Sequence, residues 1–279
     1  MTLLTDSLIV DGVRLAYRDR GQGEPVIFIH GTPSHSHEWR DVVPRIEAAG
    51  FRAVTYDLLG YGRSERPVDR DTSVAAQAEL LEHLLDALGV DRVSIVAHDI
   101  GGAIGQRFSL AHPERVRRLM LIDSVSFDSW PSPTWKKIIE EHLDDVAAMS
   151  QDEFNALLTR QLKMTVADDS LMSGDVLQAY LAPHQSAPGR VSFFEHQVRH
   201  YDSTYTEEIS DQLGHLTAPV RIVWGEEDQW QPARYAKRLS DAIPHAELVV
   251  VPGAGHFLME DAPERVVREI GDFLGAPLR

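Results

Sequence analysis

Short apolar runs alternate with longer amphipathic stretches along most of the chain. Most of the runs are rich in Val and Ile, which is typical of strands buried on both faces of a parallel sheet. We predict strands at residues 8–10, 13–17, 26–29, 51–56, 93–97, 116–122, 220–224 and 247–251. The Asp11-Gly12 pair between the first two runs predicts a β-hairpin.

The stretches between the runs carry apolar residues at helical spacing. In the stretch that begins at Trp39, Val43 and Ile46 fall on the same helical face. Gly50 then follows as a helix stop. Helices are predicted at residues 39–49, 74–88, 103–111, 233–243 and 263–274. This alternation predicts an α/β fold, in which a mostly parallel sheet has helices on both faces.

Residues 128–213 interrupt the alternation. They contain no convincing strand, and helices are predicted there at 133–149, 152–163, 170–180 and 192–201. The segment is acidic, with 15 Asp and Glu against 6 Lys and Arg. An insertion between parallel strands lies at the carboxyl edge of the sheet, where ligands bind. We therefore expect a helical cap at 128–213 over a core made of 1–127 and 214–279.

Composition narrows the function classes. The 279 residues carry a formal net charge of −16, which argues against nucleic acids and anionic membranes as partners. No apolar run is long enough to span a membrane, and the first residues do not resemble a signal peptide. The absence of cysteine excludes disulfides and a thiol nucleophile. We expect a cytoplasmic protein, either a monomer or a homodimer.

Residues 97–101, Ala-His-Asp-Ile-Gly, match a nucleophile elbow, the sharp turn between a strand and a helix. Ala97 and Gly101 are small, as the close backbone approach in this turn requires. Asp99 occupies the nucleophile position, where most such elbows carry Ser. Alternatively, Asp99 could simply cap the helix that follows, because Asp is a favoured N-cap residue.

An aspartate nucleophile points to a particular class of reaction. The carboxylate is ionised at neutral pH and needs no base to activate it. Attack on an acyl carbon would produce a high-energy anhydride, whereas attack on a saturated carbon produces an alkyl ester that water can cleave. Asp99 therefore indicates a substrate with an sp3 carbon that bears a leaving group, namely an epoxide or a carbon–halogen bond.

Two loops supply candidates for the remaining chemistry. In this architecture the loop His-Gly-Thr-Pro at 30–33 provides one N–H of the oxyanion hole, and the residue after the nucleophile provides the other. We predict the backbone amides of Thr32 and Ile100 in this role. The loop Gly-Ala-Gly-His-Phe at 253–257 follows a predicted strand and presents His256 as the catalytic histidine.

The catalytic acid has two candidates. Asp228 lies in the loop 225–232, which follows a predicted strand and has the pattern G-x-x-D-x-x-x-P. With Asp228, the order nucleophile, acid, histidine agrees with this architecture. Asp123 follows the predicted strand 116–122 and is the alternative acid. The chain has no P-loop and no H-E-x-x-H motif, so we expect neither a cofactor nor a metal.

Two further motifs complete a resemblance that covers the whole chain. They are Asp-Leu-Leu-Gly-Tyr-Gly-Arg-Ser at 57–64 and Ala-His-Pro-Glu-Arg-Val at 111–116. The chain resembles the α/β-hydrolases with an Asp nucleophile, the branch of epoxide hydrolases and haloalkane dehalogenases. The resemblance implies an eight-stranded sheet with a helical cap inserted after strand 6. It also implies that Asp99 forms an alkyl-enzyme ester, which water activated by His256 then hydrolyses. Some dehalogenases of this branch carry their acid where Asp123 lies.

This chain lacks the residues that usually donate hydrogen bonds to the halide in haloalkane dehalogenases. These enzymes resemble one another in a Trp after the nucleophile and an Asn in the first loop, whereas this chain has Ile100 and Thr32 there. Trp130 and Trp135 in the expected cap are substitute donors. Haloacetate dehalogenases carry an Arg beside the nucleophile, and this chain does not.

Epoxide hydrolases resemble one another in the HGxP loop and in two cap tyrosines. Tyr201 lies about where one of the pair is expected, with Tyr205 near it and Tyr180 earlier in the cap. Where the other tyrosine is expected, His142 is the nearest candidate donor. We predict hydrolysis of an epoxide to a diol, with a small, neutral, largely apolar substrate. The alternatives are a haloalkane or haloacid dehalogenase, an esterase-like or lyase-like relative, and a ligand sensor with little turnover.

Overall fold

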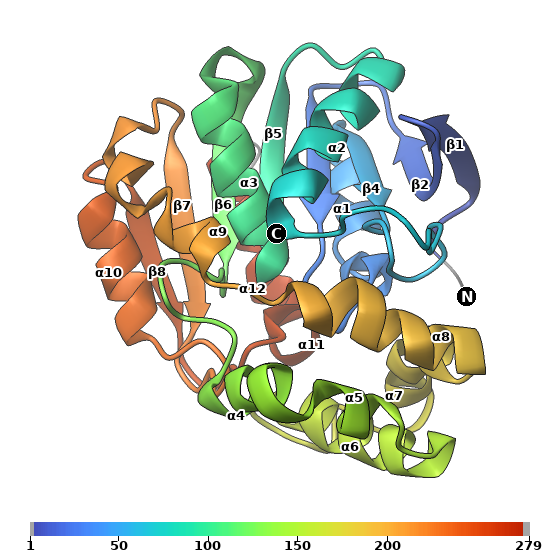
Figure 1. The fold of residues 1–279 in the computed structure, drawn as a ribbon. Coiled ribbons are helices and arrows are strands. Elements are labelled where there is room, and N and C mark those ends of the chain that lie inside the picture. Colours follow the sequence, from blue (N-terminus) through green and yellow to red (C-terminus); the bar gives the residue numbers. More distant parts are fainter. Residues whose placement is uncertain (1–2, 276–279) are drawn as a thin grey trace.

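A central sheet with helices on both faces forms the body of the protein, and a layer of further helices lies across one end of it (Figure 1). The computed structural model describes residues 3–275. The strands are β1 Asp6–Val10, β2 Val13–Arg20, β3 Pro25–Ile29, β4 Arg52–Tyr56, β5 Val93–His98, β6 Val116–Ile122, β7 Val220–Gly225 and β8 Glu247–Val251.

The eight strands form one sheet in the order β1-β2-β4-β3-β5-β6-β7-β8. β1 and β2 form the predicted antiparallel hairpin, and β2 also runs antiparallel to β4. All remaining neighbours are parallel, and Ile27 at the centre pairs with Val54 on one side and Ile95 on the other. The structure confirms the predicted α/β fold with a mostly parallel sheet.

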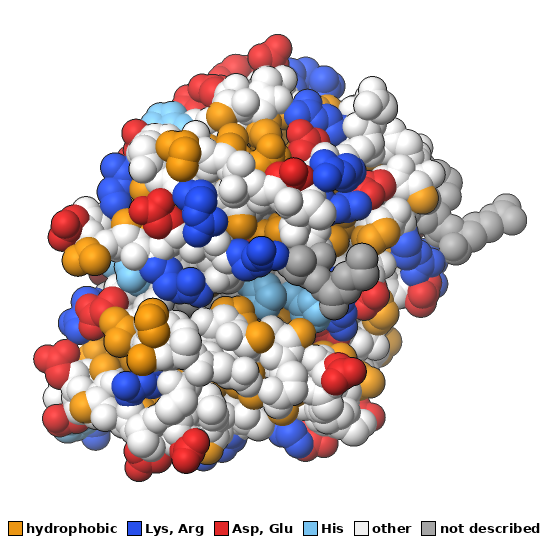
Figure 2. All heavy atoms as spheres, turned by 90° about the vertical axis from the view of Figure 1, so that its right-hand side faces the viewer, with side chains coloured by type: hydrophobic (Ala, Val, Ile, Leu, Met, Phe, Trp, Pro, Cys, Tyr) orange, Lys and Arg blue, Asp and Glu red, His pale blue; other side chains and the backbone are white. Residues whose placement is uncertain are grey.

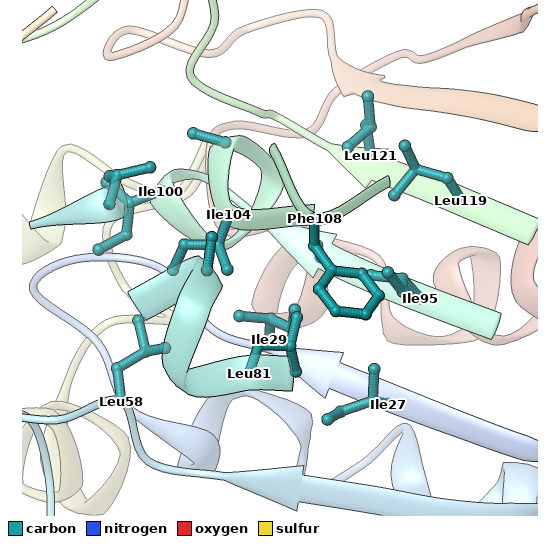
Figure 3. Close-up of a cluster of buried hydrophobic side chains, with 14 of the residues drawn as sticks. Ile27, Ile29, Leu58, Leu81, Ile95, Ile100, Ile104, Phe108, Leu119 and Leu121 are labelled. Carbon is teal, nitrogen blue, oxygen red and sulfur yellow. The ribbon is translucent and has the colours of Figure 1, made fainter. Parts of the chain in front are cut away.

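Side chains of each strand alternate between two apolar layers. Ile27 and Ile29 point into one layer, and Val26 and Phe28 into the other, because successive residues of a strand face opposite sides. Figure 3 shows Ile104 and Phe108 facing Ile27, Ile29 and Ile95 in the first layer. The core helices are α1 Val43–Ala48, α2 Val74–Ala87, α3 Ile100–Ala111, α10 Arg234–Ala242, α11 Leu258–Asp261 and α12 Pro263–Leu274.

The first predicted core helix is shorter in the structure. Instead of one helix over 39–49, a 3-10 turn at Ser36–Trp39 precedes α1, which begins at Val43. Pro44 lies in the first turn of α1. Proline has no N–H and its ring blocks the preceding turn, so a continuous helix through this position is disfavoured.

The chain between β6 and β7 forms the helical insertion. Its α-helices are α4 Pro133–Lys137, α5 Leu143–Ala147, α6 Gln151–Lys163, α7 Gly174–Leu181, α8 Ala187–Ser192 and α9 Thr204–Glu207. π-Helical turns lie at Ile138–His142 and Phe193–Gln197, with 3-10 turns at Ala182–His184, Val198–His200 and Ser210–His215. The predicted helix at 192–201 is thus irregular. Phe154, Leu158 and Phe193 form part of a third apolar cluster, which also includes Phe257 from the core.

The surface is charged and mixed in sign. On the face in Figure 2, acidic and basic side chains lie among one another, with hydrophobic side chains scattered between them. Within residues 3–275, no helix combines the length and the apolar character needed to cross a membrane.

Candidate active site

A strained turn presents Asp99 at the end of β5. Its backbone has φ 52° and ψ −120°, a conformation that costs energy for any residue other than glycine. Gly101 is required here, because a Cβ at this position would lie 2.5 Å from the carbonyl oxygen of Ile29. Asp99 precedes α3, yet its side chain makes no capping hydrogen bond to that helix. The elbow geometry therefore favours the nucleophile interpretation over the helix cap.

The Asp99 carboxylate points into the loop at 30–33. Its Oδ1 accepts a hydrogen bond of 2.8 Å from the backbone N–H of Thr32, and its Oδ2 lies 3.5 Å from His256 Nε2. The amide of Ile100 is the first of α3 and so has no partner within the helix. Gly31 permits the approach, because a Cβ there would lie 2.6 Å from Asp99 Cβ.

His256 connects Asp99 to Asp228. His256 Nδ1 lies 2.8 Å from Asp228 Oδ2, and Asp228 Oδ1 accepts the backbone N–H groups of Trp230 and Gln231 at 2.7 and 2.8 Å. Burial disfavours a charged imidazole, but the Asp228 and Asp99 carboxylates outweigh it and raise the pKa of His256 well above its ordinary value. The structure thus brings the three predicted residues together, with His256 hydrogen-bonded to Asp228 and facing Asp99.

Asp99 remains ionised in this setting. Burial alone would raise the pKa of its carboxyl group, but His256 and the Thr32 N–H favour the carboxylate, so that the pKa ends below its ordinary value. An ionised carboxylate that is only 5% exposed keeps little water around it. Such a group suits nucleophilic attack.

Asp123 lies at the end of β6 but is not the partner of His256. Its Oδ1 accepts the N–H of Gly225 at 2.8 Å, and its Oδ2 is buried without a hydrogen-bond partner among the described residues. Burial and the nearby charge of Asp228 raise the pKa of Asp123 well above its ordinary value. Because Asp228 rather than Asp123 contacts His256 Nδ1, the geometry favours Asp228 as the acid.

A small cavity with a volume of about 70 Å³ lies above Asp99. Its wall is mostly apolar and aromatic. The lining residues are Thr32, Pro33, Asp99, Ile100, Val125, Trp130, Pro131, Ser132, Trp135, Gln161, Thr165, Phe193, Tyr201, Trp230, Gln231 and His256. The wall thus combines the carboxyl edge of the sheet with the helical insertion.

Tyr201 is the cavity tyrosine nearest to the proposed chemistry. Its hydroxyl lies 2.6 Å from Thr32 Oγ1, in the loop that binds the Asp99 carboxylate. Burial raises the pKa of Tyr201, so the hydroxyl keeps its proton. Trp130 and Trp135 pack against its ring, with centroids 5.9 and 6.4 Å away.

Other predicted donors lie elsewhere. The prediction for His142 is wrong, because its half-exposed side chain is outside the cavity wall, beside Glu141. Trp130 lines the cavity, but its indole N–H is donated to Thr206 Oγ1 at 3.0 Å. Tyr180 is outside the wall and donates its hydroxyl to Glu260. The spacing of apolar residues in the insertion did not reveal which side of each helix faces the core.

Contacts between the insertion and the His256 loop escaped the sequence analysis. The N–H of Phe257 donates to the carbonyl of Thr165 at 2.7 Å. Asp261 accepts the N–H groups of Ala167 and Gly255. No local pattern relates residues so far apart in the chain, so only the fold reveals that the insertion fixes the backbone beside His256.

Residues 24–263 match the model of the alpha/beta hydrolase fold family. The chain belongs to this family. It is 30% identical over 278 residues to a cis-3-alkyl-4-alkyloxetan-2-one decarboxylase from Shewanella oneidensis, covering 95% of this chain and 86% of the relative. It is 29% identical to haloalkane dehalogenase 2 of Mycobacterium bovis, covering 94% of this chain and 92% of the relative.

Solved structures agree with this membership. An alpha/beta hydrolase fold protein from Burkholderia ambifaria superposes with a TM-score of 0.89 at 33% identity, covering 98% of both chains. The epoxide hydrolase CorEH superposes with a TM-score of 0.82 at 23% identity over 97% of this chain and 98% of the other, a likeness of fold alone. The chain is an α/β-hydrolase enzyme.

Proposed function

We propose that the protein hydrolyses an epoxide to a diol through an alkyl ester on Asp99. The observation that carries this proposal is the position of the Tyr201 hydroxyl, 2.6 Å from Thr32 Oγ1 at the cavity wall. Thr32 itself binds the nucleophile through its backbone N–H. The position of this hydroxyl supports Tyr201 as the donor of a proton to the alkoxide that an opening ring would leave.

In the first step, a carboxylate oxygen of Asp99 attacks a ring carbon, and the carbon–oxygen bond of the ring breaks. The ring oxygen takes the electron pair of that bond and the proton of the Tyr201 hydroxyl. Trp135 is the second donor that we propose for this oxygen. Its indole N–H has no hydrogen-bond partner among the described residues, and the ring lines the cavity beside Tyr201.

In the second step, His256 takes a proton from water, and the hydroxide attacks the ester carbonyl. Formation of the ester neutralises Asp99 and so removes one of the two charges that raise the pKa of His256. The imidazole becomes a base when one is needed. The amides of Thr32 and Ile100 stabilise the oxyanion. As the intermediate collapses, His256 gives its proton to the leaving alkoxide, which completes the diol. The proton of the new Asp99 carboxyl group returns to the Tyr201 oxygen, which restores both residues.

Halide release has less support in this cavity. Ile100 has an apolar side chain, and the indole N–H of Trp130 is already bonded to Thr206. Of the two substitute halide donors, Trp135 alone therefore offers the cavity an N–H that has no partner within residues 3–275. A tyrosine hydroxyl beside the nucleophile provides a proton, which an alkoxide needs and a halide does not.

A second candidate function comes from the decarboxylase that is 30% identical to this chain. Its substrate, an oxetan-2-one, is also a strained ring with an oxygen bound to a saturated carbon. Loss of carbon dioxide from that ring gives an alkene, whereas addition of water to an epoxide gives a diol. Product analysis with both substrate types therefore separates the two functions.

The test of the proposed ester uses His256→Gln, which blocks the second step. Intact mass spectrometry after incubation with epoxides is expected to show the enzyme plus the full mass of one epoxide. A haloalkane would add its mass minus the hydrogen halide. In the matched control Asp99→Asn/His256→Gln, no adduct is expected. A folded His256→Gln enzyme that forms no adduct with either class contradicts the proposal.

A further inference from the structure

A second histidine–carboxylate pair lies behind His256. His98 is the last residue of β5, directly before Asp99, and its side chain is fully buried. Its Nδ1 lies 3.3 Å from Oε1 of Glu38, whose side chain is also fully buried. Neither residue lines the cavity, so the pair cannot contact a substrate there. A buried charged pair is costly unless it has a role or excellent geometry.

The other nitrogen of His98 binds the backbone of the catalytic histidine. His98 Nε2 lies 3.0 Å from the carbonyl oxygen of His256, and the centroids of the two imidazole rings are 4.8 Å apart. A backbone carbonyl can only accept a hydrogen bond, so Nε2 of His98 must carry a proton. His98 therefore holds the residue whose own Nε2 faces Asp99.

Glu38 holds the other side of the His98 ring. Neither oxygen of Glu38 has another hydrogen-bond partner among the described residues, and the contact with Nδ1 is aligned too poorly for a regular hydrogen bond. A proton must nevertheless lie between Glu38 and Nδ1, because their lone pairs would otherwise repel each other in this dry site. The contact keeps the ring turned with Nε2–H toward the His256 carbonyl. Without Glu38, Nδ1 loses this partner, and the ring can turn so that Nε2–H leaves the carbonyl.

We propose that Glu38 and His98 are positioning residues for His256. Glu38 fixes the ring of His98 through Nδ1, His98 holds the His256 carbonyl through Nε2–H, and the His256 ring stays aimed at Asp99. Because the first step uses Asp99 and Tyr201, the pair acts on hydrolysis of the ester rather than on its formation. Only this kinetic consequence rests on the proposed function.

The tautomer of His98 can be measured without any substrate. NMR of the enzyme with isotope-labelled histidine is expected to show a proton on Nε2 of His98, with the signal assigned through His98→Gln. In Glu38→Leu the signal of this proton is expected to shift, because its hydrogen bond to the His256 carbonyl weakens. In Glu38→Gln it is expected to stay, because the amide can donate to Nδ1. An unprotonated Nε2 in the wild-type enzyme would overturn the proposal.

Single-turnover kinetics then test the role in catalysis. Glu38→Leu is expected to slow ester hydrolysis roughly 10- to 100-fold, as a displaced catalytic group does, while ester formation stays within about threefold. Glu38→Gln is expected to hydrolyse the ester nearly as fast as wild type. Glu82→Leu is the matched control, because Glu82 pairs with His112 at the surface. Its rates are expected to be those of wild type.

A double variant isolates the effect that Glu38 exerts through His98. In His98→Gln the amide donates to the His256 carbonyl whatever Glu38 does, so Glu38→Leu/His98→Gln is expected to regain most of the hydrolysis rate. A wild-type hydrolysis rate in Glu38→Leu, or an equally slow rate in Glu38→Gln, overturns the proposal. If no variant forms an ester, the proposed function has failed, and the NMR result alone decides whether Glu38 controls His98.

Discussion

Replacing Tyr201 with Phe removes the proposed proton donor and almost nothing else. The ring remains, with its contacts to Trp130 and Trp135, and only the hydroxyl that lies 2.6 Å from Thr32 Oγ1 is lost. Loss of one buried hydrogen bond costs about 1 kcal/mol of stability. Loss of a donor to a developing oxyanion costs about 3 kcal/mol of transition-state stabilisation, or roughly 100-fold in rate. The kinetic effect should therefore far exceed the effect on folding.

The assay for Tyr201→Phe is a single turnover with excess enzyme, in which the alkyl ester is measured by intact mass after rapid quenching. Ester formation is expected to slow roughly 100-fold, whereas hydrolysis of the ester changes little. Tyr205→Phe is the matched control, because Tyr205 is near in sequence but outside the cavity wall. If ester formation in Tyr201→Phe stays within about threefold of wild type, the reasoning about the donor is wrong.

Three further predictions concern the acid, the histidine and the elbow. Asp228→Asn should lower kcat about 10³- to 10⁴-fold, whereas Asp123→Asn should lower it less than about tenfold, and steady-state kinetics compare the two. The folded-state pKa of His256 is raised above 6.5, so its stabilising contribution is present below that pH and is lost as the pH rises through the folded-state value. Urea unfolding should therefore show a decline in stability at alkaline pH that is smaller in His256→Gln. Gly101→Ala should destabilise the fold by about 3 kcal/mol or more, because the added Cβ meets the Ile29 carbonyl, and a wild-type Tm would contradict this.

Much of the core could be predicted because its signals are local. Strands such as β3 and β5 are buried on both faces, so they form apolar runs that need no knowledge of their partners. The elbow was predictable for a related reason. Gly101 is required by the turn itself, and together with Ala97 it identifies Asp99 without any distant contact.

The rest of the site, beyond Asp99, Asp228 and His256, could not be predicted because it depends on contacts between residues that are far apart in the sequence. Whether Asp228 or Asp123 holds His256 could not be decided, because both follow strands that end at the same edge of the sheet. The role of Trp130 changed because its N–H meets Thr206, far along the chain. In the insertion, short helices and π-helical turns blur the helical period, so the pattern could not show which side chains reach the cavity.

In the proposed ester mechanism, Asp99 gives one of its oxygen atoms to the product. One turnover of excess wild-type enzyme on an epoxide, in water labelled with heavy oxygen, tests it directly. The ester mechanism predicts an unlabelled diol in this first turnover and heavy oxygen in the peptide that contains Asp99. Heavy oxygen in the first diol, with none in that peptide, would show that water attacks the epoxide directly and would contradict the account.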